Sequence, residues 1–153
     1  MNELSHTNHK GEAKMADVSA KEISLRKAEA CGQIMLQPET CRLIREDLMK
    51  KGSVLTVAQI AGISAAKDCA RLIPLCHPLP LSRIDVTPKL TESGVEVSSC
   101  VVSTGRTGVE MEALTAVSVA LLTVYDMCKA VDKTMSITAI HLVSKTKTPV
   151  NSQ

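Results

Sequence analysis

The chain has 153 residues, of which 44% are hydrophobic, and a formal net charge of +2 at neutral pH. This composition is typical of one folded domain with a real core, and it excludes a disordered chain. The charge is too small to favour duplex nucleic acid, and Tyr125, the only aromatic residue, cannot form a stacking surface for single strands. We therefore expect no nucleic-acid partner.

The first half of the chain opens with a polar stretch, residues 1–14, that we expect to be flexible. The spacing of apolar residues then predicts strands at 15–19 and 24–36, and helices at 38–52 and 54–72. Pro38 suits the first turn of one helix, and Pro74 ends the other.

The second half begins with a rigid, extended loop at 73–82, because this segment contains three prolines. Further elements are then predicted: strands at 83–90 and 95–103 around a turn at 91–94, a helix at 109–131 and a strand at 135–144. We expect a flexible tail at 146–153, which leaves 15–145 as a single domain.

This order predicts an α+β fold of the ferredoxin-like type, β-α-β-β-α-β, with an extra N-terminal strand and an extra helix. The sheet would be antiparallel, with its helices on one face. Because the strands are rich in aliphatic residues, we expect another subunit to cover the opposite face.

The helix at 109–131 carries no charge between Ala113 and Tyr125, and its charged residues gather at its two ends. A helix that is apolar on all sides is typical of a core. Charged groups beside such an element are candidates for partial burial, and partly buried charges are often functional. The ends of this helix are therefore the first place to look for a site.

Glu112 and Asp126 share one face of this helix but lie about 21 Å apart along its axis, too far for a carboxylate pair within one subunit. Asp126 and Lys129 share a face at i,i+3 spacing. Two interpretations are open for them: a surface ion pair, or an acid/base pair in a partly desolvated site.

The turn Gly105-Arg-Thr-Gly108 before this helix is compatible with an anion site at a helix N-terminus, and equally with an ordinary strand-to-helix turn. His77, next to Cys76 in the proline-rich loop, has three interpretations: a structural histidine, a ligand-contacting or proton-transferring one, or a metal ligand. The sequence offers no matching Cys/His set at zinc spacing, so we expect no metal site.

Six cysteines occur without any C-x-x-C pair, and the N-terminus does not resemble a secretion signal. We expect reduced thiols, no membrane span and a cytoplasmic location. Several basic residues could meet a polyphosphate if the fold brings them together: Arg26, Lys50, Lys51, Arg106, Lys129 and Lys145.

Residues 4–145 resemble the cyclic pyranopterin monophosphate synthase family of molybdenum-cofactor biosynthesis. The segments that carry the resemblance are HKGEAKMADVSAKEISLRKA (9–28), KGSVL (51–55), VAQIAGISAAK (57–67), LIPLCHPL (72–79) and TGRTGVEMEALTAVSVALLTVYDMCKAV (104–131).

The resemblance implies a lyase that converts 3′,8-cyclo-7,8-dihydroguanosine 5′-triphosphate to cyclic pyranopterin monophosphate and pyrophosphate. It implies ferredoxin-like subunits assembled as a hexamer, a trimer of dimers, with active sites at subunit interfaces. It assigns catalytic roles to Asp126, Lys129 and Lys51, and substrate contacts to Leu75, Cys76, His77, Met111 and Glu112. Lysines can hold the triphosphate, and Mg²⁺ can accompany it. We expect the Glu112 carboxylate to accept guanine-type N–H groups.

Three features depart from the family pattern. Ser53 replaces an aspartate, Arg106 replaces a lysine, and the tail lacks the glycines of relatives. Two other classes of function stay open on the residues alone: a non-catalytic ligand-binding module, and a structural oligomer whose charged helix ends form interface ion pairs.

Overall fold

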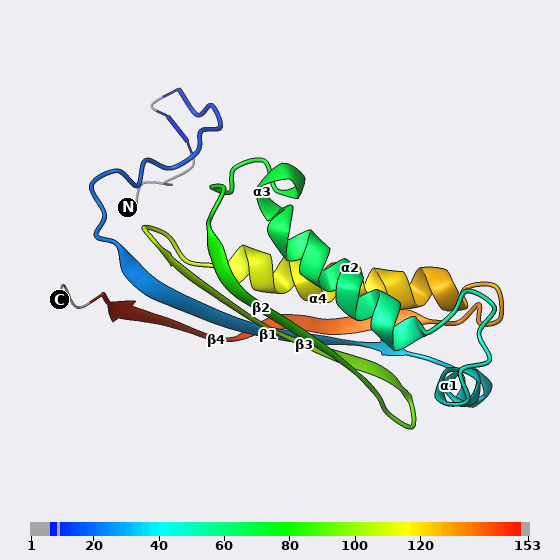
Figure 1. The fold of residues 1–153 in the computed structure, drawn as a ribbon. Coiled ribbons are helices and arrows are strands. Elements are labelled where there is room, and N and C mark those ends of the chain that lie inside the picture. Colours follow the sequence, from blue (N-terminus) through cyan, green and yellow to red (C-terminus); the bar gives the residue numbers. More distant parts are fainter. Residues whose placement is uncertain (1–6, 9, 151–153) are drawn as a thin grey trace.

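The computed structural model describes residues 7, 8 and 10–150 and shows an α+β fold (Figure 1). In chain order the elements are β1 (Ser24–Met35), α1 (Pro38–Arg45), α2 (Val54–Lys67), α3 (Cys69–Leu72), β2 (Leu81–Leu90), β3 (Gly94–Gly105), α4 (Glu110–Cys128) and β4 (Ser136–Pro149).

The four strands form one sheet in the order β2-β3-β1-β4, and every neighbouring pair is antiparallel. β1 is central, so that Ala28 lies opposite Val101 of β3 on one side and Lys145 of β4 on the other. The long helices α2 and α4 lie side by side over the same face of the sheet (Figure 1). The predicted antiparallel sheet is confirmed, with four strands.

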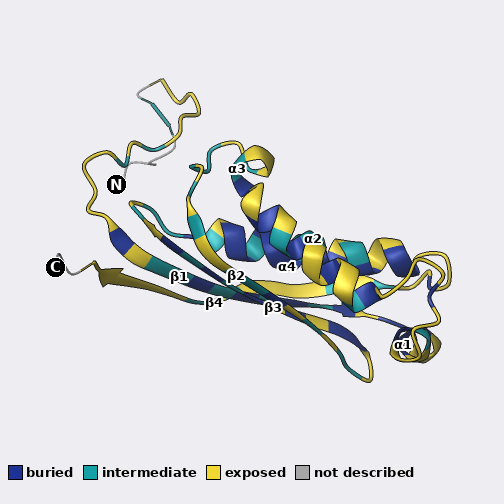
Figure 2. Ribbon diagram, in the orientation of Figure 1, coloured by how far each residue is buried: buried dark blue, intermediate teal, exposed yellow. Residues whose placement is uncertain are grey.

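The core lies between this sheet and α4 (Figure 2). On β1, alternate residues such as Ala28, Ala30 and Ile34 are buried, as the period of a strand requires. On α4, Val117 and Leu121 have no exposed surface. By length and composition alone α4 could cross a membrane, but here it is a largely buried core helix, as its uncharged sequence predicts.

Small residues compensate for the lack of aromatic side chains in this core. Ala58, Gly62 and Ala66 of α2 are buried, and Ala116 and Ala120 of α4 are fully buried. A Cβ atom at Gly62 would lie 2.9 Å from the backbone oxygen of Ala116. Small side chains therefore allow the two helices to approach closely enough to bury their backbones against each other.

The opposite face of the sheet is polar. It carries the ion pairs Lys27–Glu29, at 2.8 Å, and Arg83–Asp85, at 2.5 Å. The expectation that another subunit covers this face stays a prediction. The alternation of each strand turns its aliphatic residues toward the helices and its polar residues outward.

A buried carboxylate fixes α1 to the end of α4. Asp132, only 2% exposed, accepts hydrogen bonds from the backbone N–H of Gln37, at 2.8 Å, and from the hydroxyl of Thr40, at 3.1 Å. Burial raises the pKa of Asp132, but the hydrogen bonds from Gln37, Thr134 and Thr40 outweigh it and leave the pKa below its usual value. Asp132 is thus a structural charge at the first turn of α1.

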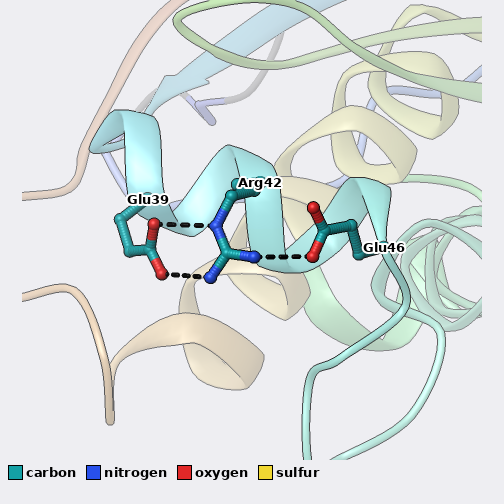
Figure 3. A network of polar contacts seen from close by, with 3 residues as sticks. All are labelled: Glu39, Arg42 and Glu46. Atoms are coloured by element: carbon teal, nitrogen blue, oxygen red, sulfur yellow. Dashed lines mark hydrogen bonds and ion pairs between the residues drawn. The ribbon is translucent and has the colours of Figure 1, made fainter.

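The outer surface of α1 carries a small ion-pair network (Figure 3). The Arg42 guanidinium donates two hydrogen bonds to Glu39, at 2.9 and 2.6 Å, and one to Glu46, at 2.6 Å. All three side chains are largely exposed, so the network supports the helix only weakly.

Three elements predicted in the first half of the chain differ from the structure. The strand at 15–19 is irregular backbone ending in a turn; side-chain donors from other segments bind its carbonyls in place of a partner strand. The helix at 38–52 ends at Arg45, and the helix at 54–72 is interrupted at Asp68.

The last strand continues to Pro149, because Lys147 and Thr148 still pair with β1. The flexible tail predicted from 146 is therefore partly strand. Residues 1–6 and 9 of the predicted flexible N-terminal segment, and 151–153 of the tail, lie outside the described residues.

Candidate active site

Lys51, Asp126 and Lys129 meet at the C-terminal end of α4. The two carboxylate oxygens of Asp126 are divided between the two ammonium groups: Oδ2 lies 2.8 Å from Lys51 Nζ and Oδ1 lies 2.7 Å from Lys129 Nζ. Lys51 also donates to the backbone oxygen of Asp126, at 3.0 Å. Tertiary folding thus joins a residue that precedes α2 to the predicted pair on α4.

The local sequence explains this geometry. Lys51 precedes Gly52, whose φ of 97° lies in the left-handed region that favours glycine and turns the chain into α2. Asp126 and Lys129 are one helical turn apart, so their side chains share a face. The three groups line a shallow depression of about 410 Å³, together with Tyr125, a residue that the sequence did not assign to a site.

The two lysines determine the charge state of Asp126. Hydrogen bonds from Lys129 and then Lys51 lower the pKa of Asp126 to about 2, and the same carboxylate raises the pKa of Lys129. At neutral pH the cluster therefore holds one carboxylate and two ammonium groups. All three side chains are about half exposed, so the cluster adds little to stability but stays accessible to a ligand.

A second group of predicted residues lies near the N-terminus of α4. Glu112 is 4% exposed, and burial raises the pKa of its carboxyl group. The Cys69 and Cys76 thiols are among the groups that influence this carboxyl group or respond to its charge. Met111 is 38% exposed beside it. A buried carboxyl group with few strong partners is suited to binding paired N–H donors.

The proline-rich loop contributes His77 to this end of the molecule. His77 Nε2 lies 2.8 Å from the backbone oxygen of Ala16. Because a carbonyl oxygen only accepts, Nε2 carries the hydrogen, and His77 fixes the segment before β1. Leu75 and Cys76 are partly buried in the same loop. Among the described residues no group of three or more His, Cys, Asp or Glu side chains could hold a metal ion.

The two groups do not meet within one chain. α4 is one continuous helix from Glu110 to Cys128, so Glu112 and Asp126 lie about 21 Å apart along its axis. The structure therefore brings Lys51, Asp126 and Lys129 together and keeps Glu112 and His77 at the far end.

The turn Gly105–Gly108 connects β3 to α4, which agrees with its interpretation as an ordinary strand-to-helix turn. The Arg106 guanidinium donates to the backbone oxygens of Ser19, at 3.0 Å, and of Lys21. Arg106 thus holds the segment that leads into β1, and its side chain is engaged within the chain.

Beside this turn lies a basic pocket that the sequence could not locate, here called the β1–β4 pocket. It has a volume of about 170 Å³. Its walls include Arg26, Lys27, Glu110, Lys145 and Lys147. The register between β1 and β4 creates it, because Arg26 lies directly opposite Lys147.

The β1–β4 pocket is short of negative charge. Glu110 pairs with Lys145, at 3.1 Å, and among the described residues it is the only acidic one in the lining. Like charges directly opposite each other destabilise a sheet, and the buried Nε of Arg26 has no hydrogen-bond partner in the described residues. Both features favour an anion in this pocket.

The chain matches the MoaC family model over residues 15–148. It is 53% identical over 146 residues to the cyclic pyranopterin monophosphate synthase of Chloroflexus aurantiacus, covering 94% of this chain and 90% of that protein. It is 52% identical over 147 residues to the enzyme of the same name from Thermomicrobium roseum, covering 95% and 89%. Identity is 53% over 144 residues to a molybdenum cofactor biosynthesis bifunctional protein of Chlorobaculum tepidum, covering 94% of this chain and 46% of that protein.

Proposed function

The chain belongs to the MoaC family, and we propose that it is a lyase of molybdenum-cofactor biosynthesis. The reaction is the conversion of 3′,8-cyclo-7,8-dihydroguanosine 5′-triphosphate to cyclic pyranopterin monophosphate with release of pyrophosphate. The observation that supports this most strongly is the cluster of Asp126 with Lys51 and Lys129, which is accessible to a ligand and holds a carboxylate between two cations.

In the proposed mechanism Asp126 moves protons while the purine ring opens and the pterin forms. With both lysines bound to it Asp126 is a weak base, because they hold its pKa near 2. An anionic substrate that attracts Lys51 or Lys129 loosens these bonds and makes Asp126 more basic. Substrate binding and proton transfer are thereby coupled.

The β1–β4 pocket is the proposed site of the triphosphate. Arg26, Lys145 and Lys147 offer the positive charge that stabilises a departing pyrophosphate. Mg²⁺ in this proposal travels with the phosphates, because Mg²⁺ is commonly bound through substrate phosphates and a few waters. The substrate base would then lie toward Glu112, whose carboxylate accepts its N–H groups, with Leu75, Cys76, His77 and Met111 around it.

The proposed active site combines two copies of the chain. The β1–β4 pocket and Glu112 lie at one end of α4, and Asp126 lies at the other. Within one copy, these groups are therefore too far apart to act on the same substrate molecule. An antiparallel, two-fold pairing of subunits brings the Glu112 end of one copy to the Asp126 end of its partner.

The surface of the helical layer suits such a pairing. Val57 and Ile60 of α2, and Leu122 and Tyr125 of α4, are apolar and between 38% and 59% exposed. Because several segments of the chain resemble the cyclic pyranopterin monophosphate synthase family, we extend this proposal to a trimer of such dimers. We place this assembly in the cytoplasm. The subunit in this proposal is ferredoxin-like, with α1 and α3 as additions to its first crossover.

The direct test is incubation with the cyclised triphosphate and measurement of pyrophosphate and of the pterin product. We expect release by the unmodified chain and a loss of at least about 100-fold in Asp126→Ala and Lys51→Ala. The matched control is Asp68→Ala, which breaks an exposed i,i+3 pair with Arg71 and should retain activity. Pyrophosphate release that is unchanged in both site variants would overturn the assignment.

A further inference from the structure

A thiol and an imidazole meet on the polar face of the sheet, the face away from α2 and α4. The Sγ atom of Cys31, on β1, lies 3.5 Å from Nε2 of His141 on β4. The two residues are direct cross-strand neighbours. Neither belongs to the proposed active site.

The backbone assigns the hydrogen on the imidazole. His141 Nδ1 lies 2.7 Å from the carbonyl oxygen of Ala139, which can only accept, so Nδ1 carries the hydrogen. In the neutral imidazole Nε2 then carries the free lone pair, and Cys31 Sγ lies beside the ring, 3.5 Å from Nε2 and 3.8 Å from Nδ1. A nucleophile, a base within hydrogen-bond reach and a third group that orients the base are the arrangement of an activated nucleophile.

An irregularity in the sheet produces this contact. The register between β1 and β4 shifts between Cys31 and Gln33, and Ala139 has a φ of 56°. Bulges of this kind redirect side chains. Here Ile140 turns toward the helices, where it packs over Gly32, and His141 turns to the opposite face.

A cavity gives a small molecule access to the thiol. It has a volume of about 410 Å³ on the polar face. Cys31 and His141 line it together with Gln33, Lys89 and Glu96. Lys89 and Glu96 are cross-strand neighbours of opposite charge, which suits a zwitterionic ligand.

The other cysteines lack this environment. Cys41, Cys69 and Cys128 are buried, and burial raises the pKa of each thiol. Burial also raises the pKa of Cys76. Cys100 is partly buried on the same face as Cys31 but lies between Glu29 and Asp85 on the neighbouring strands.

We propose that Cys31 and His141 form a reactive thiol site that exchanges with small zwitterionic disulfides. The Cys31 proton passes to His141 Nε2, and Sγ attacks one sulfur of the disulfide. A new S–S bond to Cys31 forms as the disulfide bond breaks, and the leaving thiolate takes the proton from the imidazolium. Cys31 is oxidised to a mixed disulfide and half of the small molecule is reduced to a free thiol.

The test uses the full chain with glutathione disulfide, followed by intact-mass measurement over time and peptide mapping. We expect a single glutathionyl adduct on Cys31 that dithiothreitol removes. Cys31→Ser should abolish this fast adduct and Cys100→Ser should keep it. His141→Gln should slow adduct formation by at least about tenfold.

Circular dichroism of each variant checks that the sheet is intact, and iodoacetamide labelling of urea-unfolded protein normalises the thiol count. Three outcomes would each overturn the proposal. The first adduct could form on Cys76 or Cys100, no adduct could form at all, or the rate of adduct formation in His141→Gln could be within twofold of the rate in the unmodified chain. Because none of these readings involves pyrophosphate release, they stand or fall independently of the proposed lyase activity.

Discussion

At the scale of single residues, the charges around α4 separate into three kinds. Asp132 is buried and fully hydrogen-bonded, and it is structural. Asp126 is exposed and balanced between two lysines. Glu112 is buried with little compensation. Asp132 anchors α1, and in the proposed function Asp126 moves protons and Glu112 recognises the substrate.

The task of Glu112 gives a prediction about substrate affinity. Glu112→Gln keeps the volume but replaces one acceptor oxygen with a donor amide. We expect KM to rise at least about tenfold, because the loss of a charged hydrogen bond costs about 1.5–3 kcal/mol. Glu22→Gln, an exposed change before β1, serves as the control. Steady-state kinetics with KM unchanged in Glu112→Gln would rule out recognition by this carboxylate.

The task of Asp132 gives a prediction about stability and its pH dependence. We expect Asp132→Ala to lower the free energy of unfolding by about 1–3 kcal/mol near pH 7, because the Gln37 N–H and the Thr40 hydroxyl lose their acceptor. Chemical denaturation measures the difference, with Glu92→Ala in an exposed turn as the control.

The sign of the pH effect follows from the lowered pKa of Asp132. A carboxyl group whose pKa is lower in the folded state stabilises the fold above its unfolded pKa, about 3.9, and loses this contribution as the pH falls toward its folded pKa. The gap between the unmodified chain and Asp132→Ala should therefore be constant above about pH 5 and shrink below about pH 4. A gap that widens in acid would contradict this account.

At the scale of elements, the packing of α2 on α4 depends on the absence of a side chain at Gly62. A Cβ there meets the backbone of Ala116, which cannot rotate away, so the helices must separate. We expect Gly62→Val to destabilise the fold by about 1–3 kcal/mol through overpacking. Ser64→Val, on the exposed side of the same helix, is the matched control. Equal melting temperatures of the two variants would show that the helices are not in close contact at Gly62.

Sequence periodicity predicted the elements whose burial is regular. β1 alternates and α4 carries no charge between Ala113 and Tyr125, so both were found within a few residues of their true ends. The segment 15–19 contains the apolar residues Met15, Ala16 and Val18, but a strand also needs a partner, and no partner is visible in a local pattern. β4 was predicted too short because its last residues are polar and are held by pairing with β1.

In the candidate sites, too, a contact that depends on local spacing was predictable, and contacts that depend on the tertiary structure were not. The i,i+3 spacing of Asp126 and Lys129 predicted their contact, which the structure confirms. Lys51 came from the family resemblance, because its approach to Asp126 depends on the path from α1 to α2. The Arg26–Lys147 pair could not be predicted from the sequence, because it depends on the register between two strands and no spacing along the chain encodes that register.

At the scale of the whole molecule, the length of α4 determines how the proposed active site would have to be assembled. The helix is rigid, so its two ends cannot approach each other within one copy. We therefore propose that pairing between subunits is a condition of activity, and we expect dilution below the dissociation constant of the dimer to abolish turnover.

The measurement that tests this claim most directly is complementation between two kinds of subunit that are each impaired at low substrate. Asp126→Ala and Glu112→Gln are each assayed alone for pyrophosphate release at low substrate, then mixed, unfolded and refolded together. In a mixed dimer one of the two sites receives an intact Glu112 from one copy and an intact Asp126 from the other. We expect activity to return to about a quarter of the unmodified level, since half of the dimers are mixed and each has one intact site. A mixture no more active than its two components would show that each active site is built from a single copy.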